Sequence, residues 1–421
     1  MTTRWRSAAV AAAAVGLVVA PVGTGAGAVY AWDAAAAHTQ TTTAPAAAPT
    51  PATEPTPTPA PTSASDEFAQ LTPAVARQLD DSIRKVLAEA KIPGVIVAVS
   101  APGKGEYVRS FGVADKATGA PMTPNLNMRI GSVTKTFTVT ALLELVDDGK
   151  VGLDDPIAKY VDGVPNGDRI TLRELAGMRS GLFNYSADED FYKAFTSNPD
   201  RPFTPQELLD YSFKHPVLFE PNAKFYYCNT NLILLGLVVE KVSGTPLDRF
   251  IDREVVEPAG LKDTLFPTGP EFPEPHAQGY TNQTASGKVE NSTDWNPSWG
   301  WAAGAMISDL SDLRSWAKTL ATGTLLTPAT QAQRLDVVDA IPGAGYGLGI
   351  FNVQGWIGHN GSLPGYGSLV LYLPEAKATL VVLLNTDISY ENQEPSTLFG
   401  EAITEIVTPD RVYSLPAQPP S

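Results

Sequence analysis

The sequence predicts an α+β protein in which both ends of the folded chain build one antiparallel sheet and a helical part is inserted between them. Short apolar runs rich in β-branched residues lie near residues 95–113 and again near residues 349–384. Between them, from about residue 130 to about 325, apolar residues recur mostly at helical spacing. This order favours a sheet flanked by helices, with the functional site where the two parts meet.

The first part of the domain is expected to hold an amphipathic helix followed by a hairpin. Apolar residues recur at helical spacing over Leu71–Ala90, and Pro93-Gly94 ends that pattern. The β-branched run Val95–Val99 and the stretch Tyr107–Val113 are predicted strands, joined by a turn that contains Pro and Gly.

The remainder of the domain repeats both patterns. Helices are predicted over Phe137–Val146, Pro205–Ser212, Leu232–Val242 and Leu310–Leu320. Strands are predicted over Gly349–Val353, Leu369–Leu373 and Thr379–Leu384, with a short strand-like stretch at Gly355–Gly358. We assign the domain to residues 67–412, with a sheet part over about 67–129 and 326–412, a helical part over about 130–325, and a tail over 413–421.

The N-terminal 31 residues have the layout of a secretory signal peptide. Arg4 and Arg6 precede the apolar run Ala8–Ala20, and Ala26-Gly27-Ala28 fits the small-residue pattern expected of a cleavage site. The protein is therefore expected to be secreted or associated with the cell envelope, outside the cytoplasmic membrane. An uncleaved leader is the alternative, and it is the one route to membrane anchoring that we expect.

Residues 32–66 are predicted to form a disordered stalk rich in Thr, Pro and Ala. Residues 39–64 contain nine Thr, seven Pro and seven Ala. Such a segment buries too little apolar surface to offset its ordering entropy, so an extended, semi-rigid spacer is expected. It either holds the domain away from a surface or acts as a passive linker.

Composition excludes several classes of function. The formal charge is −15 and the sequence pI is about 4.7, which argues against nucleic acid and against an anionic membrane surface as partners. There is one cysteine, Cys228, and the four histidines are scattered without an HExxH pair. We therefore expect no catalytic metal and no cofactor.

The chemistry is predicted to begin at Ser132-Val133-Thr134-Lys135. Residues three apart on a helix lie about 5–6 Å from one another at Cβ, so Ser132 and Lys135 share a face. Ser132 opens an apolar helix, whose free N–H groups can hold an oxyanion and whose positive end can lower the pKa of Lys135. Ser132 is the candidate nucleophile and Lys135 its base. The motif is weak alone, because a helix N-cap is the commoner use of such a serine.

Two further motifs supply candidate partners. Tyr227 precedes Asn229 by two residues, so that a hydroxyl can relay protons while an amide orients a substrate. Downstream, His359 is followed by Gly361, which permits close backbone approach, and by Ser362, whose N–H can be a second oxyanion donor. Core packing for Tyr227, a turn for Asn229 and a surface position for His359 are the alternatives.

Taken in order, these motifs resemble the serine β-lactamase and penicillin-binding protein superfamily. Within it, the chain is most similar to the branch of class C β-lactamases and secreted D-alanyl-D-alanine carboxypeptidases. The resemblance extends over essentially all of residues 67–410, with supporting stretches at Met128–Ser132, Ile170–Leu175, Ser180–Leu182, Pro221–Gly236, Ala303–Ala305 and Gly365-Tyr366.

The resemblance implies a β-lactamase/transpeptidase-like α/β sandwich with an inserted all-helical domain, and a role for each residue. Ser132 would form an acyl-enzyme, and Lys135 and Tyr227 would share general-base and general-acid duty. Asn229 would bind the substrate amide, and His359 would hold the substrate carboxylate or tune Tyr227. The N–H groups of Ser132 and Ser362 would form the oxyanion hole, beside Gly361.

Two departures from the family pattern stand out. Cys228 occupies a position where many relatives have Ser, and we expect it to be a small buried residue. Asn360 occupies the place of a Thr, so it lacks the hydroxyl that would bind a substrate carboxylate. The second departure weakens the case for efficient β-lactamase action.

The expected function is that of an exported serine hydrolase, similar to D-alanyl-D-alanine carboxypeptidases, that cleaves cell-wall peptides. Its partner would be a small molecule or peptide: a peptidoglycan stem peptide, a β-lactam or an acyl ester. The alternatives are a carboxylesterase, a D-amino-acid amidase or a weak class C-like β-lactamase on the same fold. A non-catalytic binding module is a further alternative.

Overall fold

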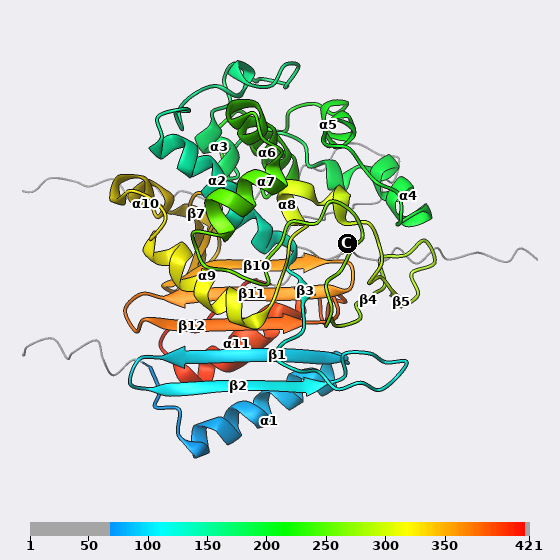
Figure 1. Cartoon of the computed structure of the whole chain (residues 1–421), viewed down its shortest axis with the longest axis vertical. Helices are drawn as coiled ribbons and strands as arrows, with labels where there is room; N and C mark the ends of the chain where they lie inside the picture. The colour runs from blue at the N-terminus through cyan, green and yellow to red at the C-terminus, as the bar shows by residue number, and fades with distance from the viewer. Residues whose placement is uncertain (1–67, 417–421) are drawn as a thin grey trace, which may run out of the picture.

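An eight-stranded antiparallel sheet forms the centre of the computed structural model, which describes residues 68–416 (Figure 1). Its order is β2-β1-β12-β11-β10-β9-β8-β7. The strands are β1 (Gly94–Ala101), β2 (Gly105–Gly112), β7 (Val338–Ile341), β8 (Ala344–Tyr346), β9 (Phe351–Val353), β10 (Trp356–Leu363), β11 (Tyr366–Leu373) and β12 (Ala378–Leu384). The prediction that both ends of the chain build one sheet is confirmed, because β1 pairs with β12.

The longer helices follow the predicted helical segments. They are α1 (Pro73–Glu89), α2 (Thr134–Asp147), α4 (Glu189–Ser197), α5 (Pro205–Phe213), α6 (Asn229–Ser243), α9 (Leu310–Thr322) and α11 (Pro395–Val407). Shorter helices are α3 (Leu172–Ala176), α7 (Leu247–Ile251), α8 (Trp301–Gly304) and α10 (Pro328–Arg334), with 3-10 turns η1 (Gly131–Val133), η2 (Ile157–Lys159), η3 (Tyr185–Ala187) and η5 (Pro297–Trp299) and a π-helical turn η4 (Asp252–Val256). Small two-stranded pairs join β3 (Met128–Arg129) to β6 (Ile307–Ser308) and β4 (Tyr280–Thr281) to β5 (Glu290–Asn291).

The sheet is covered on both faces. Figure 1 shows α9 in front of it and α11 behind it, with α1 packed beside α11. The remaining helices gather around the apolar helix α6, which contacts α2, α3, α5, α7 and α8. The buried apolar side chains of α6 are Leu232, Ile233, Leu234, Leu235, Val238 and Val239, so this helix forms the core of the helical part.

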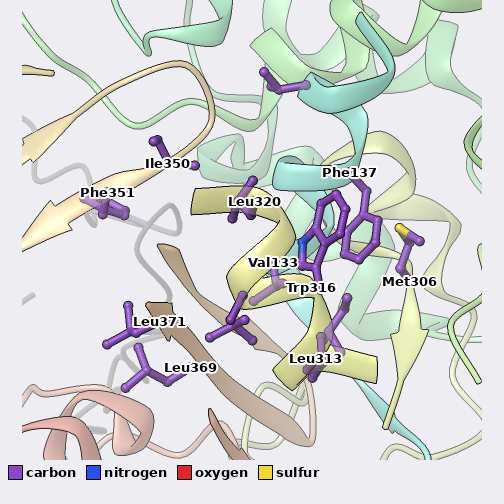
Figure 2. Packing of buried hydrophobic residues seen from close by; sticks show 14 of the residues in the cluster. Val133, Phe137, Met306, Leu313, Trp316, Leu320, Ile350, Phe351, Leu369 and Leu371 are labelled. Atoms are coloured by element: carbon purple, nitrogen blue, oxygen red, sulfur yellow. The ribbon is translucent and has the colours of Figure 1, made fainter. Parts of the chain in front are cut away.

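Helix α9 departs from the expected division of the chain. We placed it in the helical part, but it packs against β11 and β12. The reason is its apolar stripe. Trp316 is fully buried, and its ring stacks on Phe137 of α2 at a centroid distance of 4.0 Å (Figure 2). Helix α9 therefore joins the sheet to the helix that carries the candidate base.

The predicted C-terminal tail also differs from the structure over its first residues. Tyr413 is fully buried and its N–H donates to the Thr404 hydroxyl at 2.8 Å. A Cβ at Gly400 would lie 2.7 Å from the Tyr413 ring, so the absent side chain on α11 makes room for this tyrosine. The domain thus continues to at least Leu415, which is also buried. The predicted signal peptide and stalk lie outside the described residues.

No helix within residues 68–416 has the length and apolar character needed to cross a membrane.

Candidate active site

Ser132 lies in the 3-10 turn η1, which runs directly into α2. Gly131 starts this turn with φ +50°, a conformation that glycine adopts without strain. Ser132 is partly exposed, whereas Gly131 and Val133 on either side are buried. The turn therefore places the Ser132 hydroxyl at the start of α2, between two buried residues.

Lys135 is fully buried directly beneath Ser132. Its Nζ donates to Ser132 Oγ at 2.9 Å and to the carbonyl oxygen of Ala303, in α8, at 2.7 Å. Burial lowers the pKa of Lys135 well below its usual value, and the charge of Glu394 opposes this shift. A neutral amine has a lone pair, so Lys135 can accept the Ser132 proton while one N–H remains bonded to Ala303.

Tyr227 forms a second wall of this site. Lys135 Nζ lies 4.9 Å from the centroid of the Tyr227 ring, which also stacks parallel to Phe351 of β9. Burial raises the pKa of Tyr227 well above its usual value, while Ser132 lowers it. Within residues 68–416 the buried Tyr227 hydroxyl has no hydrogen-bond partner of ordinary geometry. It is therefore a protonated hydroxyl near the nucleophile that is available to a reacting group.

His359 is buried inside β10 rather than lying after a strand, because this strand extends to Leu363. Its Nδ1 is 2.5 Å from the carbonyl oxygen of Asn360, and its Nε2 is 3.2 Å from the Tyr346 hydroxyl. A carbonyl only accepts, so we assign the proton to Nδ1, and Nε2 accepts from Tyr346. Burial, together with the nearby Lys135, lowers the pKa of His359 to about 3. The ring is neutral at physiological pH.

Gly361 and Ser362 bring β10 against the nucleophile turn. A Cβ at Gly361 would lie 2.0 Å from the carbonyl oxygen of Ile130, which excludes any larger residue. A Cβ at Gly131 would lie 2.7 Å from the backbone nitrogen of Ser362. The Ser362 N–H is thus beside the turn that carries Ser132, which is the arrangement a two-donor oxyanion hole requires.

Asn229 begins α6 and is tied into a small polar network. Its Nδ2 donates to Ser186 Oγ at 3.1 Å, and its backbone N–H donates to Asn184 Oδ1 at 3.1 Å. The carbonyl end of Asn229 is therefore the end suited to accept from a substrate N–H. The sequence motifs did not single out Asn184 and Ser186, although they follow directly after the family-like stretch Ser180–Leu182.

Cys228 lies in the protein core. It is fully buried, and its Sγ lies 3.5 Å from the carbonyl oxygen of Leu182. Burial raises the pKa of this thiol to about 11, so it stays neutral. Its position is that of a small packing residue.

Glu394 and the role of Asn360 were missed by sequence reasoning. Glu394 precedes α11 and is buried, and its Oε2 accepts from Asn360 Nδ2 at 2.6 Å. The two residues are 34 positions apart, and no local motif links them. Asn360 therefore binds an internal carboxylate from the place where the family pattern has a threonine.

A possible cation-binding cluster in the described part of the chain lies at the start of α9 and in the loop after η4, not at Ser132. The carboxylate oxygens of Asp263, Asp309 and Asp312 come within 4.8 Å of one another. Asp312 Oδ2 already accepts from the Asp263 N–H and the Thr264 hydroxyl, and Asp309 caps α9. These hydrogen bonds explain the cluster, because they fix the start of α9.

The arrangement around Ser132 can perform acyl transfer. It combines a nucleophile, a buried neutral amine at 2.9 Å, a protonated phenol and two backbone donors at one point between α2 and β10. The single-residue roles in this scheme stay predictions.

Curated relatives include a D-aminopeptidase and a protein named flp. The protein flp of Staphylococcus aureus (strain MW2) is 27% identical over 333 residues, covering 76% of this chain and 65% of its own. The D-aminopeptidase of Brucella anthropi is 28% identical over 324 residues, covering 73% of this chain and 59% of its own. The chain thus spans less than two thirds of the length of both relatives.

Solved structures match over more of their length. A D-stereospecific amidohydrolase from Streptomyces sp. has 29% identity and a TM-score of 0.69, covering 74% of this chain and 94% of its own. The D-amino acid amidase of Ochrobactrum anthropi SV3 complexed with L-phenylalanine amide has 30% identity and a TM-score of 0.69, covering 79% and 96%. A penicillin-binding protein homologue from Pyrococcus abyssi has 27% identity and a TM-score of 0.67, covering 78% and 76%.

The family model described as Beta-lactamase matches residues 79–398, which include every predicted site residue. With the predicted sandwich fold confirmed by these structures, the chain belongs to the Beta-lactamase family of the serine β-lactamase and penicillin-binding protein superfamily.

Proposed function

We propose that this protein hydrolyses amide bonds of D-amino acid derivatives through an acyl-enzyme on Ser132. The observation that carries the proposal is the 2.9 Å contact between Ser132 and a buried Lys135 whose pKa is depressed. The neutral amine takes the serine proton, and the hydroxyl oxygen attacks the substrate carbonyl. The N–H groups of Ser132 and Ser362 hold the oxyanion.

The second half of the reaction returns the proton and releases the acyl group. Tyr227, with its raised pKa, is suited to relay the proton from Lys135 to the leaving amine. Collapse of the tetrahedral intermediate then breaks the amide bond and leaves the acyl group on Ser132. Water hydrolyses this ester and restores the free serine.

The choice of D-amino acid amides rests on His359 and on the relatives. Both ring nitrogens of His359 are engaged inside the protein, and the ring is uncharged. The neutral ring offers no positive charge to a substrate carboxylate, whereas an amide needs none. The similar amidases from Streptomyces and Ochrobactrum anthropi support the same substrate class.

A D-alanyl-D-alanine carboxypeptidase is the second candidate. The likeness to the penicillin-binding protein homologue from Pyrococcus abyssi supports it, as does the leader-like N-terminus. For either activity we propose a location outside the cytoplasmic membrane, with the Thr- and Pro-rich stalk as the spacer. The carboxylesterase and weak β-lactamase alternatives differ in the substrate that acylates Ser132, and in the binding-module alternative no compound acylates it.

The test compares wild type with Ser132→Ala. D-phenylalanine amide, an acyl-D-alanyl-D-alanine peptide and a p-nitrophenyl ester are supplied as substrates, and a penicillin is supplied as a probe, with intact-mass spectrometry of each mixture. We expect release of D-phenylalanine by wild type and none by Ser132→Ala. A lasting penicillin adduct with release of D-alanine would favour the carboxypeptidase. Turnover of the ester alone would favour an esterase, and no adduct with any compound would favour a binding module.

A further inference from the structure

A buried carboxylate lies behind the strand that lines the candidate active site. Glu394 is 5% exposed and Asn360 is 2% exposed. Asn360 Nδ2 donates to Glu394 Oε2 at 2.6 Å, so the carboxylate is held against β10 at the residue between His359 and Gly361. This pair is part of the wall of the site, yet the proposed reaction does not use it.

Glu394 acts on the reacting groups through its charge. It raises the pKa of Lys135 against the dominant effect of burial, and it adds to the effect of burial in raising the pKa of Tyr227. Glu394 therefore contributes negative charge to the reaction centre.

The polar atoms of Asn360 point to the same conclusion. The amide end of Asn360 donates to Glu394. Its Oδ1 is buried and has no hydrogen-bond partner within residues 68–416. A substrate carboxylate near this pair would therefore be repelled by the like charge of Glu394, in surroundings of low dielectric constant.

Asn360 lies close along β10 to the nucleophile turn. Ser362, whose N–H lies beside the nucleophile turn, is two residues from Asn360, and two strand residues span about 7 Å. Strand β9 pairs with β10 only over Trp356–Gly358, so the β9 side of residues 359–363 is not paired with β9. A group attached to a carbonyl held at Ser132 would therefore lie near residue 360.

We propose that Glu394, acting through Asn360, is a specificity-determining residue that excludes substrates with a carboxylate near the scissile bond and selects neutral leaving groups. This inference rests on the proposed amide hydrolysis at Ser132. It assigns the preference for an amide over a free dipeptide to electrostatic repulsion at a named residue. Together with the neutral His359, it explains how a site of this family can favour amides.

The experiment compares two substrates that form the same acyl-enzyme. D-phenylalanyl-D-alaninamide and D-phenylalanyl-D-alanine differ only in the charge of the leaving group, and kcat/KM is measured at pH 7 for release of D-alaninamide or D-alanine. We expect the full-length wild type to prefer the amide by about tenfold or more. The Glu394→Gln variant should reduce this preference by about tenfold, because Gln keeps the shape and removes the charge.

Glu405→Gln is the matched control, since Glu405 is exposed on the same helix. Its substrate preference should stay within about twofold of wild type. The ratio of the two rates cancels any effect of Glu394 on Lys135 that both substrates share.

Two results would overturn the inference. One is an unchanged preference for the amide in Glu394→Gln. The other is a wild-type protein with equal kcat/KM for the free dipeptide and the amide, a result that does not depend on the folding of any variant. Failure of the proposed function is distinguishable, because then neither substrate is cleaved and neither acylates Ser132.

Discussion

Lys135 carries the reaction because it is an amine in a fully buried position. Its pKa is depressed by burial, and its Nζ contacts Ser132 and Ala303. We predict that Lys135→Met lowers kcat by about a thousandfold or more, because the nucleophile and its base act as one unit. The folded state should persist, since a methionine of similar length fills the same space. Steady-state kinetics and circular dichroism measure both, and retained turnover in a folded variant would remove Lys135 as the base.

His359 should make stability depend on pH. The pKa of His359 falls from 6.5 to about 3 because of burial, so between these values the unfolded chain binds a proton that the folded protein does not. Stability is therefore lost as pH falls through this window. Between pH 7 and pH 4 we predict that wild type loses about 3 kcal/mol more unfolding free energy than His359→Gln does.

Urea unfolding of both proteins at the two pH values provides the measurement. Other titrating carboxylates are present in both proteins and cancel in the difference. Burial raises the pKa of Asp387, one of them, to about 6, which gives it the opposite sign. An equal loss of unfolding free energy in wild type and in His359→Gln would show that the fold does not hold the His359 ring neutral.

At the scale of elements, the site depends on the close approach of β10 to the turn before α2. A Cβ at Gly361 would lie 2.0 Å from the Ile130 carbonyl oxygen and 2.4 Å from Ser368 Oγ. We predict that Gly361→Ala lowers kcat/KM by about a hundredfold or more, because the Ser362 donor moves away from Ser132 and a misplaced donor loses most of its effect.

The control for this substitution is Gly152→Ala. A Cβ there would meet only ordinary contacts, at 3.4 Å from Asp155, and Gly152 is exposed. Activity and the thermal midpoint should stay near wild type in Gly152→Ala. If Gly361→Ala is equally active, the oxyanion donor lies elsewhere.

At the scale of the whole molecule, the C-terminal residues close the core. Ending the chain after Val412 removes the buried side chains of Tyr413 and Leu415. We predict that this truncation lowers the free energy of unfolding by about 3–5 kcal/mol, as for other large buried side chains. Chemical denaturation of the truncated protein and of the full chain tests this, and equal free energies of unfolding would support a tail that begins at residue 413.

The sequence by itself determined the sheet built from both chain ends, the principal helices and the ordered set of site motifs. These features depend on local periods and turn residues, which are visible along the chain: α6 lies around the predicted Leu232–Val242, and β12 lies at the predicted Thr379–Leu384. The family followed from Ser132, Lys135, Tyr227 and His359 in order, because their spacing reflects where strands and helices end.

Only the tertiary structure decided what surrounds these residues. The neutral state of His359 depends on Tyr346 and on burial, and the partner of Asn360 is Glu394, 34 positions away. The packing of α9 on the sheet and of Tyr413 against α11 likewise arises from contacts between distant segments. Burial, pKa and hydrogen-bond partners are properties of those contacts, and no pattern along the chain encodes them locally.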